Sequence, residues 1–399
     1  MQASETSSGI QQASMPLDSD RRVLLPLALE NLEAPPEESD YVNLHGLSMG
    51  TSWQVQLYLP PDQGHNTTIE ARIHELQQGI QAQLDLVVAQ MSPWENDSDL
   101  MRFNRAEAGT WHKLPQAFCE VLEHALFLAE QTQGAYDPSI GHLADLWGFG
   151  AAGKVASCPS RKEIQAAVAM TNWRSLRYRK DPDNLHGHCY QAGGIHLDLC
   201  STAKGYGVDL VARYLRSKKI PSYLIEVGGE LRGWGMKPDY QPWWVELENP
   251  PGQPQNAQHE QKIHDADIVA LHGLSIASSG DYRRYFEVDQ QRFSHTIDPR
   301  TGYPVQHGLC SVTVLHPECM IADALATAIS VLGPDQGLAY AQSLQVAARL
   351  VVREFDQHGA AHYRESFSPA YLRMLDETSE LDETVNASDD RTKIPALDS

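Results

Sequence analysis

The chain contains 399 residues, of which 42% are hydrophobic and 21% are charged, a composition typical of a globular protein with one large domain or two ordinary ones. Its 31 Lys and Arg stand against 52 Asp and Glu, which gives a formal net charge of −21 and argues against nucleic acid as the main partner. A polyanionic nucleotide bound to such a chain would need a local cation, either a metal ion or a buried lysine.

Much of the negative charge lies in two tails. Residues 1–40 hold eight carboxylates against two arginines, and residues 376–399 hold eight against one Arg and one Lys, so each tail carries −6. Both tails are rich in Ser, Asp, Glu and Pro and poor in aromatic residues, which is typical of disorder. We therefore predict disordered tails at 1–40 and 376–399 and one folded domain at 41–375. Within it, the segment 249–267 is rich in Pro, Gln, Asn and His, which indicates a surface insertion.

The cysteines and the hydrophobic runs indicate in which compartment of the cell the protein is located. None of the six cysteines forms a C-x-x-C pair, which disfavours zinc and dithiol redox sites and favours reduced core residues. No apolar run reaches the roughly 18 residues that a transmembrane segment needs. Met1–Leu17 lacks the basic start and apolar stretch of a signal peptide. We therefore expect no transmembrane segment and a cytoplasmic location.

Hydrophobic spacing predicts helices, and short apolar runs predict strands. The first half contains a strand pair or one long strand at Leu44–Leu59, helices at Thr68–Gln90, with Asn66 and Thr67 as possible caps, Pro115–Gln131 and Arg161–Val168, a strand at Ile195–Leu199 and a helix at Lys204–Leu215. The second half contains strands at Ser222–Val227, Trp243–Leu247, Leu274–Ala277, Tyr285–Val288 and Ser311–Leu315, helices at Cys319–Leu332 and Pro334–Ser343, and a strand at Val346–Arg353. Because helices and strands mix without a regular βαβ rhythm, we predict an α+β fold.

Two glycine-containing turns could bring the backbone close to a ligand. Gly-Ala-Tyr-Asp-Pro at 134–138 follows a helix and precedes Leu-Trp-Gly-Phe-Gly at 146–150, while Gly228 and Gly229 follow a strand. Adjacent glycines permit a left-handed turn or a close backbone approach. Taken alone, each segment is more simply explained as an ordinary turn.

A third segment, from Leu197 to Asp209, leads from a strand through small residues into a helix that we expect to begin at Lys204. Backbone N–H groups at a helix start favour phosphate oxygens, and Lys204 would add positive charge. The spacing of a P-loop is absent. This segment alone supports a phosphate site and a plain turn with a surface lysine about equally.

Two further segments carry polar groups suited to catalysis. Ser-Ser-Gly-Asp-Tyr at 278–282 is followed by a dense polar loop at 295–304, in which His295 could act as a general base, although a lone histidine is usually structural. Asp323 and Thr327 are four residues apart on a predicted helix and share one face. Their oxygen atoms suit Mg²⁺, although an exposed Asp on a small-residue helix is the simpler explanation of that segment alone.

The order of these segments is more specific than any one of them, and it resembles that of the ApbE family, the FAD:protein FMN transferases. The resemblance covers about residues 45–355. It is carried by Met-Gly-Thr at 49–51, Met-Ser-Pro-Trp-Glu-Asn-Asp-Ser at 91–98, Arg-Phe-Asn at 102–104, Gly-Ala-Tyr-Asp-Pro at 134–138, Asp-Leu-x-x-x-Ala-Lys-Gly-Tyr-x-x-Asp at 198–209, Val-Gly-Gly at 227–229, Ser-Gly-Asp-Tyr at 279–282, His-x-Ile-Asp-Pro-x-Thr-Gly at 295–302 and Ala-Asp-Ala-Leu-Ala-Thr at 322–327.

The resemblance implies an α+β, T-fold-related domain with FAD in a cleft and Mg²⁺ at its pyrophosphate. It implies transfer of FMN from FAD to a Thr or Ser hydroxyl of an acceptor flavoprotein, with release of AMP. By motif, the residues implied to line the FAD site are Met49, Trp94, Ala135, Tyr136, Asp137, Asp198, Lys204 and Ile297. Those implied to hold Mg²⁺ are Asp323, Thr327 and Ser201, the last through its backbone carbonyl. His295 is implied to be the base that deprotonates the acceptor hydroxyl.

Several positions depart from the common family pattern. Trp94 stands where Tyr is usual, which keeps a stacking face and loses a hydroxyl. Ser278 replaces Thr, Glu226 and Glu230 replace Asn and Asp, and Cys200-Ser201 replace a glycine pair. These departures concern the Mg²⁺ geometry and the choice of acceptor more than the FAD site. No lipobox cysteine lies near the start of the chain, which agrees with the expected cytoplasmic location.

Two other functions use the same residues. A Mg²⁺-dependent FAD pyrophosphatase would let water replace the acceptor hydroxyl and would release FMN and AMP. A non-catalytic FAD-binding protein would leave the base and the Mg²⁺ ligands unused, which the presence of His295, Asp323 and Thr327 disfavours.

Overall fold

The computed structural model describes residues 22–28, 33–62, 67–155, 157–182, 186–250, 267–281, 285–288 and 291–375. The helices are α1 (Ile69–Met91), α2 (Asp99–Asn104), α3 (Gln116–Gln131), α4 (Gly141–Leu146), α5 (Arg161–Met170), η1 (Trp173–Ser175), α6 (Cys200–Ser217) and α7 (Cys319–Ser343). The strands are β1 (Val23–Leu24), β2 (Asp40–Ser48), β3 (Thr51–Leu59), β4 (Thr110–Pro115), β5 (Arg177–Lys180), β6 (His186–Gln191), β7 (Ser222–Val227), β8 (Glu230–Trp234), β9 (Trp243–Glu246), β10 (Ile268–Leu271), β11 (Ser275–Gly280), β12 (Tyr285–Val288), β13 (Gln291–Ser294), β14 (Ile297–Asp298), β15 (Tyr303–Pro304), β16 (Leu309–His316), β17 (Ala347–Phe355) and β18 (Ala361–Phe367).

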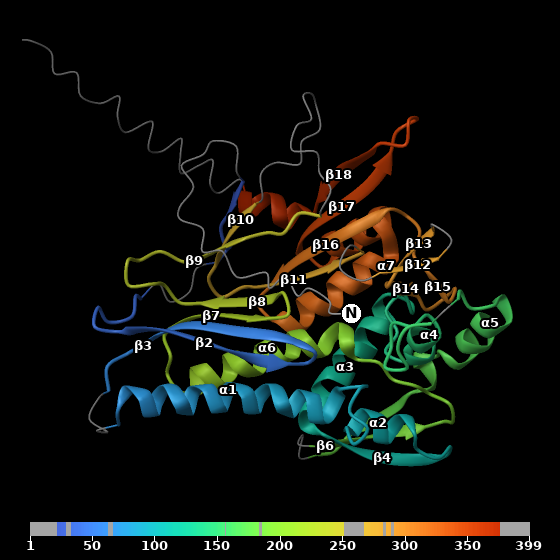
Figure 1. Cartoon of the computed structure of the whole chain (residues 1–399), viewed down its shortest axis with the longest axis horizontal. Coiled ribbons are helices and arrows are strands. Elements are labelled where there is room, and N and C mark those ends of the chain that lie inside the picture. The colour runs from blue at the N-terminus through green and yellow to red at the C-terminus, as the bar shows by residue number, and fades with distance from the viewer. Residues whose placement is uncertain are drawn as a thin grey trace, which may run out of the picture.

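An eight-stranded sheet forms the centre of the molecule, in the order β18-β17-β16-β11-β8-β7-β3-β2 (Figure 1). Its strand pairs are antiparallel. Strands from the N-terminal, middle and C-terminal parts of the chain thus share one sheet, and the mixture of helices with this sheet confirms the predicted α+β fold.

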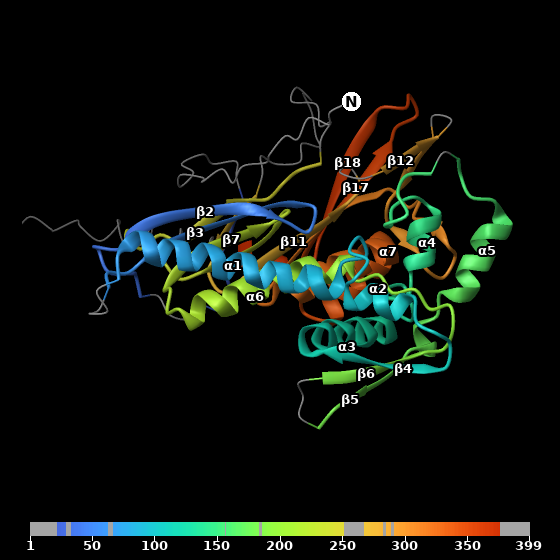
Figure 2. The ribbon, with the colours of Figure 1, turned by 60° about the horizontal axis from the view of Figure 1, so that its bottom comes forward.

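Both faces of the sheet are covered, and β7 shows why. Tyr223, Ile225 and Val227 point toward α1 and α6, whereas Leu224 joins a cluster on the opposite face with Trp243 and Tyr371. Successive side chains of a strand alternate between faces, so a strand buried on both sides is apolar almost throughout. Figures 1 and 2 show α1 and α6 lying side by side along one face of the sheet.

Helices α6 and α7 cross in direct contact at Gly205. A Cβ atom at this position would lie 2.7 Å from the carbonyl carbon of Cys319 and 2.9 Å from Cβ of Asp323. One turn further along α6, the buried Asp209 accepts hydrogen bonds from the backbone N–H groups of Cys319 at 3.0 Å and Met320 at 2.9 Å. A carboxylate at a helix N-terminus satisfies free N–H groups and complements the helix dipole. Asp209 therefore fixes the start of α7 against α6.

The remaining elements extend the molecule at two places. The three-stranded sheet of β4, β6 and β5 packs against α3, away from the large sheet (Figure 2). Helices α4 and α5 lie near the β14–β15 pair at one end of the molecule (Figure 1). Buried Leu143, Trp147, Ile164 and Ile297 form a small separate core there.

Most predicted elements are confirmed, with shifts at their ends. The Leu44–Leu59 region is the β2–β3 hairpin. The predicted break between two helices near 333 is the kink of α7, where Gly333 has φ 81° beside Pro334. The N-cap of α1 is Thr68, whose hydroxyl accepts from the Ala71 N–H at 3.3 Å, rather than Thr67, and Asn66 lies outside the described residues.

Two predictions near the start of α6 are wrong. This helix begins at Cys200 rather than Lys204, so Lys204 lies in its first turns. The predicted strand Ile195–Leu199 makes only an isolated bridge between Ile140 and His196 within the described part of the chain. A side chain supplies hydrogen-bond partners to this segment instead: Asn104 accepts from the Leu197 N–H at 2.8 Å and donates to the Leu197 carbonyl at 2.9 Å.

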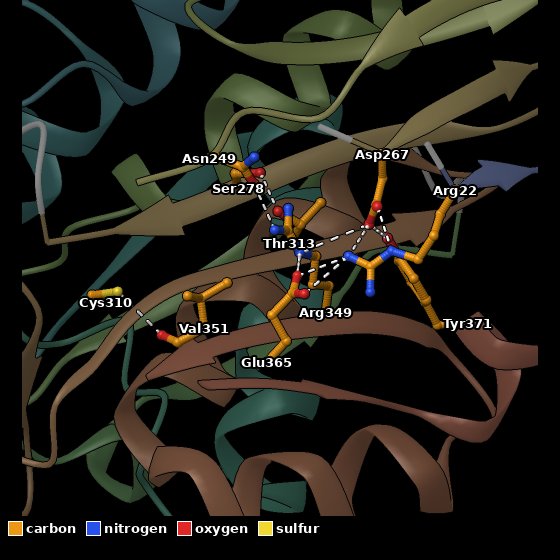
Figure 3. A network of polar contacts seen from close by, with 10 residues as sticks. All are labelled: Arg22, Asn249, Asp267, Ser278, Cys310, Thr313, Arg349, Val351, Glu365 and Tyr371. Atoms are coloured by element: carbon orange, nitrogen blue, oxygen red, sulfur yellow. Dashed lines mark hydrogen bonds and ion pairs between the residues drawn. The ribbon is translucent and has the colours of Figure 1, made fainter. Parts of the chain in front are cut away.

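A buried ionic network joins the two ends of the described chain (Figure 3). Arg22 donates to Asp267 at 2.6 Å and to Glu365 at 2.9 Å. Arg349, which is 1% exposed, donates to the same Glu365 at 2.6 Å, and the Tyr371 hydroxyl donates to Asp267. Two guanidinium groups and two carboxylates thus balance their charges, as buried ions require.

This network corrects the predicted domain limits. Val23–Leu24 form β1, which pairs in parallel with β10, so the folded part begins before Tyr41. Asp267, predicted to end a surface insertion, is fully buried. A two-residue strand has too little periodicity to be recognised in a sequence, and its partners lie more than 240 residues away. Residues 1–21 and 29–32 of the predicted tail 1–40, residues 251–266 of the predicted insertion 249–267 and the whole predicted tail 376–399 lie outside the described residues.

We predict that Gly205→Ala lowers the apparent free energy of unfolding by about 1–3 kcal/mol, because the new methyl group must displace the backbone of α7. Helix propensity alone would give the opposite sign, a gain of about 1 kcal/mol. Urea denaturation measures the difference. Gly207→Ala is the matched control, because its methyl group would meet the movable end of the Met49 side chain, at 2.6 Å from Cε, and should change stability less. Equal or increased stability of Gly205→Ala would contradict the close crossing.

We also predict that Arg22→Met lowers the apparent free energy of unfolding by about 3 kcal/mol, since it leaves the buried Asp267 with an incomplete set of partners. The comparable change Arg102→Met removes a surface ion pair with Asp99, in which the arginine side chain is 57% exposed, and should alter it by less than about 1 kcal/mol. The urea midpoints of both variants test this, and equal midpoints would show that the network does not anchor β1.

Candidate active site

The start of α6 is held by Asp198 and by the preceding turn. Asp198 accepts from the Cys200 N–H at 2.8 Å, and its own N–H donates to the Pro138 carbonyl at 2.8 Å. The turn 134–138 therefore lies directly beside the N-terminal end of α6. Two motifs that are 60 residues apart in the sequence meet here.

Tyr136 strengthens this junction. Its buried hydroxyl accepts a hydrogen bond from the Ser201 hydroxyl at 3.1 Å and shares another with Thr202. Burial raises the pKa of Tyr136 to about 12, so the phenol stays protonated at neutral pH. Ala135 beside it is also buried. Tyr136 thus positions the first turn of α6 through its hydroxyl.

The Asp137 side chain shapes its own turn. Its carboxylate accepts from the Ser139 N–H at 2.8 Å, the Ser139 hydroxyl at 2.6 Å and the Trp173 N–H at 3.3 Å. Burial raises the pKa of Asp137, although the bonds from Ser139 and Trp173 oppose the shift. These bonds rigidify the backbone that runs from Gly134 toward Pro138.

Lys204, Glu230 and Asp323 form the charged centre of the site. Lys204 on α6 makes an ion pair with Glu230 at the start of β8. Burial alone would lower the pKa of Lys204, but Glu230 and Asp323 outweigh it and raise the pKa. For Asp323, burial raises the pKa, Lys204 opposes the shift and Glu230 adds to it. One ammonium group therefore lies among two buried carboxylates.

Asp323 also binds the backbone of α6. Its Oδ2 accepts from the Gly205 N–H at 3.0 Å. In a regular α-helix this N–H donates to the carbonyl four residues earlier, which is that of Ser201. The bond therefore brings the Asp323 carboxylate to the Ser201–Gly205 turn, and it requires the close crossing of α6 and α7.

The donor set here fits Mg²⁺. Asp323 is only 6% exposed, and half-buried Thr327 follows one turn later on the same face of α7. Their carboxylate and hydroxyl oxygens, together with the Ser201 carbonyl, are ligands that Mg²⁺ prefers. Glu230 Oε2 is buried without a hydrogen-bond partner among the described residues. Two carboxylates against one lysine leave a local excess of negative charge that a divalent cation would balance.

A cavity of about 380 Å³ opens beside Asp198. Its lining includes Trp94, Asn96, Asp145, His196 and Asp198. Trp94 is 53% exposed and offers a free aromatic face. The cavity thus combines a stacking surface with polar groups that could hold a flat heterocycle.

His295 and Ile297 come from the loop around β14. Ile297 is buried in the small core with Trp147, and Trp147 donates from its indole N–H to the Gly302 carbonyl at 2.8 Å. The His295 ring lies edge-on to Phe149, with ring centroids 6.3 Å apart. The segments 146–150 and 295–304 therefore pack against each other through Trp147 and Phe149. Within the described residues, the 380 Å³ cavity is not lined by His295, Ile297, Met49 or Lys204.

Met49 approaches α6 from the β2–β3 turn. It has φ +52°, and its Cε lies close to Gly207, one turn beyond Lys204. The absence of a side chain at Gly207 lets Met49 pack there. Met49 therefore joins the β2–β3 hairpin to α6.

Several residues of this region have no role that the sequence predicts. Glu230 stands in the sequence only as a departure from the family pattern and Asn96 only as part of the 91–98 motif, while Asp145 and His196 belong to none of the quoted motifs. Asp145 lies just before the Trp-Gly-Phe-Gly segment, which is the one local signal that could have drawn attention to it. His196 and Glu230 reach the site through tertiary contacts that no local pattern encodes.

The described residues contain no group of three or more His, Cys, Asp or Glu side chains arranged to hold a metal ion, so a cation site that uses Asp323 would also need hydroxyl and carbonyl oxygens. None of the helices in the described ranges is long and apolar enough to cross a membrane. The expected cytoplasmic location stays a prediction.

Comparisons with known proteins agree with this arrangement. The model of the ApbE family matches residues 49–350. The chain is 37% identical over 327 residues to the FAD:protein FMN transferase of Haemophilus influenzae, covering 81% of this chain and 90% of that protein. It is 35% identical over 348 residues to the FAD:protein FMN transferase of Vibrio cholerae, covering 87% of this chain and 96% of that protein.

Solved structures give the same result. The flavinyl transferase ApbE of Pseudomonas stutzeri in its apo form superposes with a TM-score of 0.72 at 34% identity, covering 84% of this chain and 97% of that one. The flavin transferase ApbE of Vibrio cholerae gives a TM-score of 0.71 at 32% identity, covering 84% and 99%. The family model, the sequences and the fold agree over most of the chain, which therefore belongs to the ApbE family.

Proposed function

We propose that this member of the ApbE family is an FAD:protein FMN transferase that uses Mg²⁺ to move the FMN half of FAD onto a Thr or Ser hydroxyl of an acceptor flavoprotein. The observation that carries the proposal is the meeting of Lys204, Asp323 and the first turns of α6. A lysine, the positive end of a helix dipole and a cation site together suit a diphosphate.

The chemistry balances without a further reactant. The acceptor hydroxyl oxygen forms a bond to the FMN phosphorus, and the bond from that phosphorus to the bridging oxygen breaks, which releases AMP. The proton of the hydroxyl passes to His295 Nδ1 or Nε2. Lys204 neutralises negative charge on the phosphate oxygens as the bond breaks, and catalysis of this kind depends mainly on positioning and charge.

Each remaining predicted residue has a task in this proposal. Asp323, Thr327 and the Ser201 carbonyl would hold Mg²⁺, which supplies Lewis-acid neutralisation of the phosphate oxygens. Trp94 offers a face for a ring of FAD, and Tyr136 holds the first turn of α6. Asp198 lines the cavity, and Met49, Ala135, Asp137 and Ile297 would position the segments that surround the FAD site.

With FAD, Mg²⁺ and a panel of purified acceptor flavoproteins, we predict flavin fluorescence that stays with one acceptor in a denaturing gel, and AMP in equal amount. Free FMN as the dominant product in the presence of every acceptor would instead identify a pyrophosphatase. Labelling that proceeds equally well with EDTA would refute the role of Mg²⁺.

The site variants should separate binding from chemistry. His295→Ala is expected to lower kcat about 10²–10⁴-fold, the usual contribution of a general base, and to leave FAD affinity nearly unchanged. Asp323→Ala should lose turnover and still bind FAD, an outcome that a non-catalytic FAD-binding protein could not give. His188→Ala, in the remote β6 strand, is the matched control with wild-type kcat. A wild-type kcat for His295→Ala would remove the proposed base.

A further inference from the structure

The buried Glu230 carboxylate makes only half of the contacts that its burial demands. The residue is 3% exposed, and Oε1 is paired with Lys204. Oε2 has no hydrogen-bond partner among the described residues. A buried carboxylate oxygen that lacks a hydrogen-bond partner is unfavourable, so this atom is suited to a donor that arrives with a ligand.

The position of Glu230 limits what that donor can be. The residue opens β8 directly after Gly228-Gly229, whose φ values of +61° and +101° turn the chain sharply from β7. This turn fixes the carboxylate beside Lys204, on the side where Asp323 meets α6 at Gly205. A ligand oxygen that bears negative charge would be repelled by two carboxylates, whereas a cation or a water molecule that donates hydrogen bonds would be attracted.

We propose that Glu230 is a positioning residue of the cation site: it holds Lys204 through Oε1 and accepts, through Oε2, a hydrogen bond from water bound to the divalent cation. This inference rests on the proposed function for the cation itself. Mg²⁺ keeps several of its waters in protein sites, and carboxylates that receive hydrogen bonds from such waters orient the ion and raise its affinity.

The competing explanation gives Glu230 only a structural part, as the ion-pair partner that holds Lys204 in place. The two explanations predict different effects of neutralising Glu230 on the affinity for FAD in the absence of metal. If Glu230 merely supported the fold around Lys204, its neutralisation would weaken the binding of cation and FAD together. If it positions the cation, neutralisation weakens cation binding, whereas metal-free FAD binds as well as before or better, because Lys204 is released to the diphosphate.

The test compares Glu230→Gln with the wild-type full-length chain. Free Mn²⁺ is measured by electron paramagnetic resonance without FAD, and FAD binding is measured by flavin fluorescence in EDTA. We expect Glu230→Gln to bind Mn²⁺ about 10- to 100-fold more weakly, the range found for partners of metal ligands, with FAD affinity in EDTA unchanged or increased. Glu230→Asp, which keeps the charge on a shorter arm, should recover part of the Mn²⁺ affinity.

Glu120→Gln is the matched control. Glu120 is a carboxylate that contacts α6 from outside the site, where it accepts from the Tyr206 hydroxyl at 2.8 Å and pairs with Arg213 at 3.0 Å. It should leave Mn²⁺ affinity unchanged. Glu230→Gln with Mn²⁺ affinity within twofold of wild type would overturn the inference and leave the proposed function intact.

Parallel loss of Mn²⁺ and metal-free FAD binding in both Glu230 variants would also overturn it, in favour of the structural role. If the wild-type protein binds no Mn²⁺, with or without FAD, both the cation site and this inference are wrong. The transfer of FMN would then be tested separately.

Discussion

The crossing of α6 and α7 at Gly205 is the constraint on which the site depends. Only a residue without a side chain lets the backbone of Cys319 and the Cβ of Asp323 come this close. The Gly205 N–H then reaches Asp323, and the preceding residue, Lys204, makes an ion pair with Glu230 and is close enough to Asp323 for the carboxylate to raise its pKa. Asp209 fixes the same pair of helices one turn away by capping α7. Moving either helix would separate the lysine from the carboxylate.

The large sheet makes this crossing possible. Strand β8 brings Glu230 under α6, while β16 leads into α7 and sets its start. The turn 134–138 is attached to α6 through Pro138 and Tyr136, whereas the loop 295–304 is attached through Trp147 to the end of α4. In a chain with a net charge of −21, the half-buried Lys204 and the proposed cation site would together allow a flavin transferase of the ApbE family to hold an anionic diphosphate.

The sequence predicts best what is encoded locally. Strand β7 and the two parts of α7 have their own apolar periodicity and clear glycine and proline breaks, so they are found nearly to the residue. Segment Ile195–Leu199 has the composition of a strand, but Asn104 supplies the partners that a neighbouring strand would provide. Strand β1 cannot be recognised in the sequence, because the adjacent Arg22 is held by Asp267 and Glu365, which lie far along the chain.

The same distinction applies to the site. Motifs identify Lys204, Asp323 and Tyr136 because their neighbours form recognisable patterns. Glu230 gains its role only from the packing of β8 against α6, and His196 only from its bridge with Ile140 at the start of α4. The alignment of Asp323 with the Gly205 N–H is a tertiary contact over 118 residues, and no local pattern specifies it.

The central claim is that a divalent cation and the diphosphate of FAD meet between α6 and α7. Crystals soaked with FAD and Mn²⁺ test it most directly, through the anomalous signal of the metal. The account predicts one strong peak bound by Asp323 and Thr327, with the diphosphate of FAD against Lys204. A diphosphate bound away from Lys204, or a metal peak that does not touch Asp323, would contradict it.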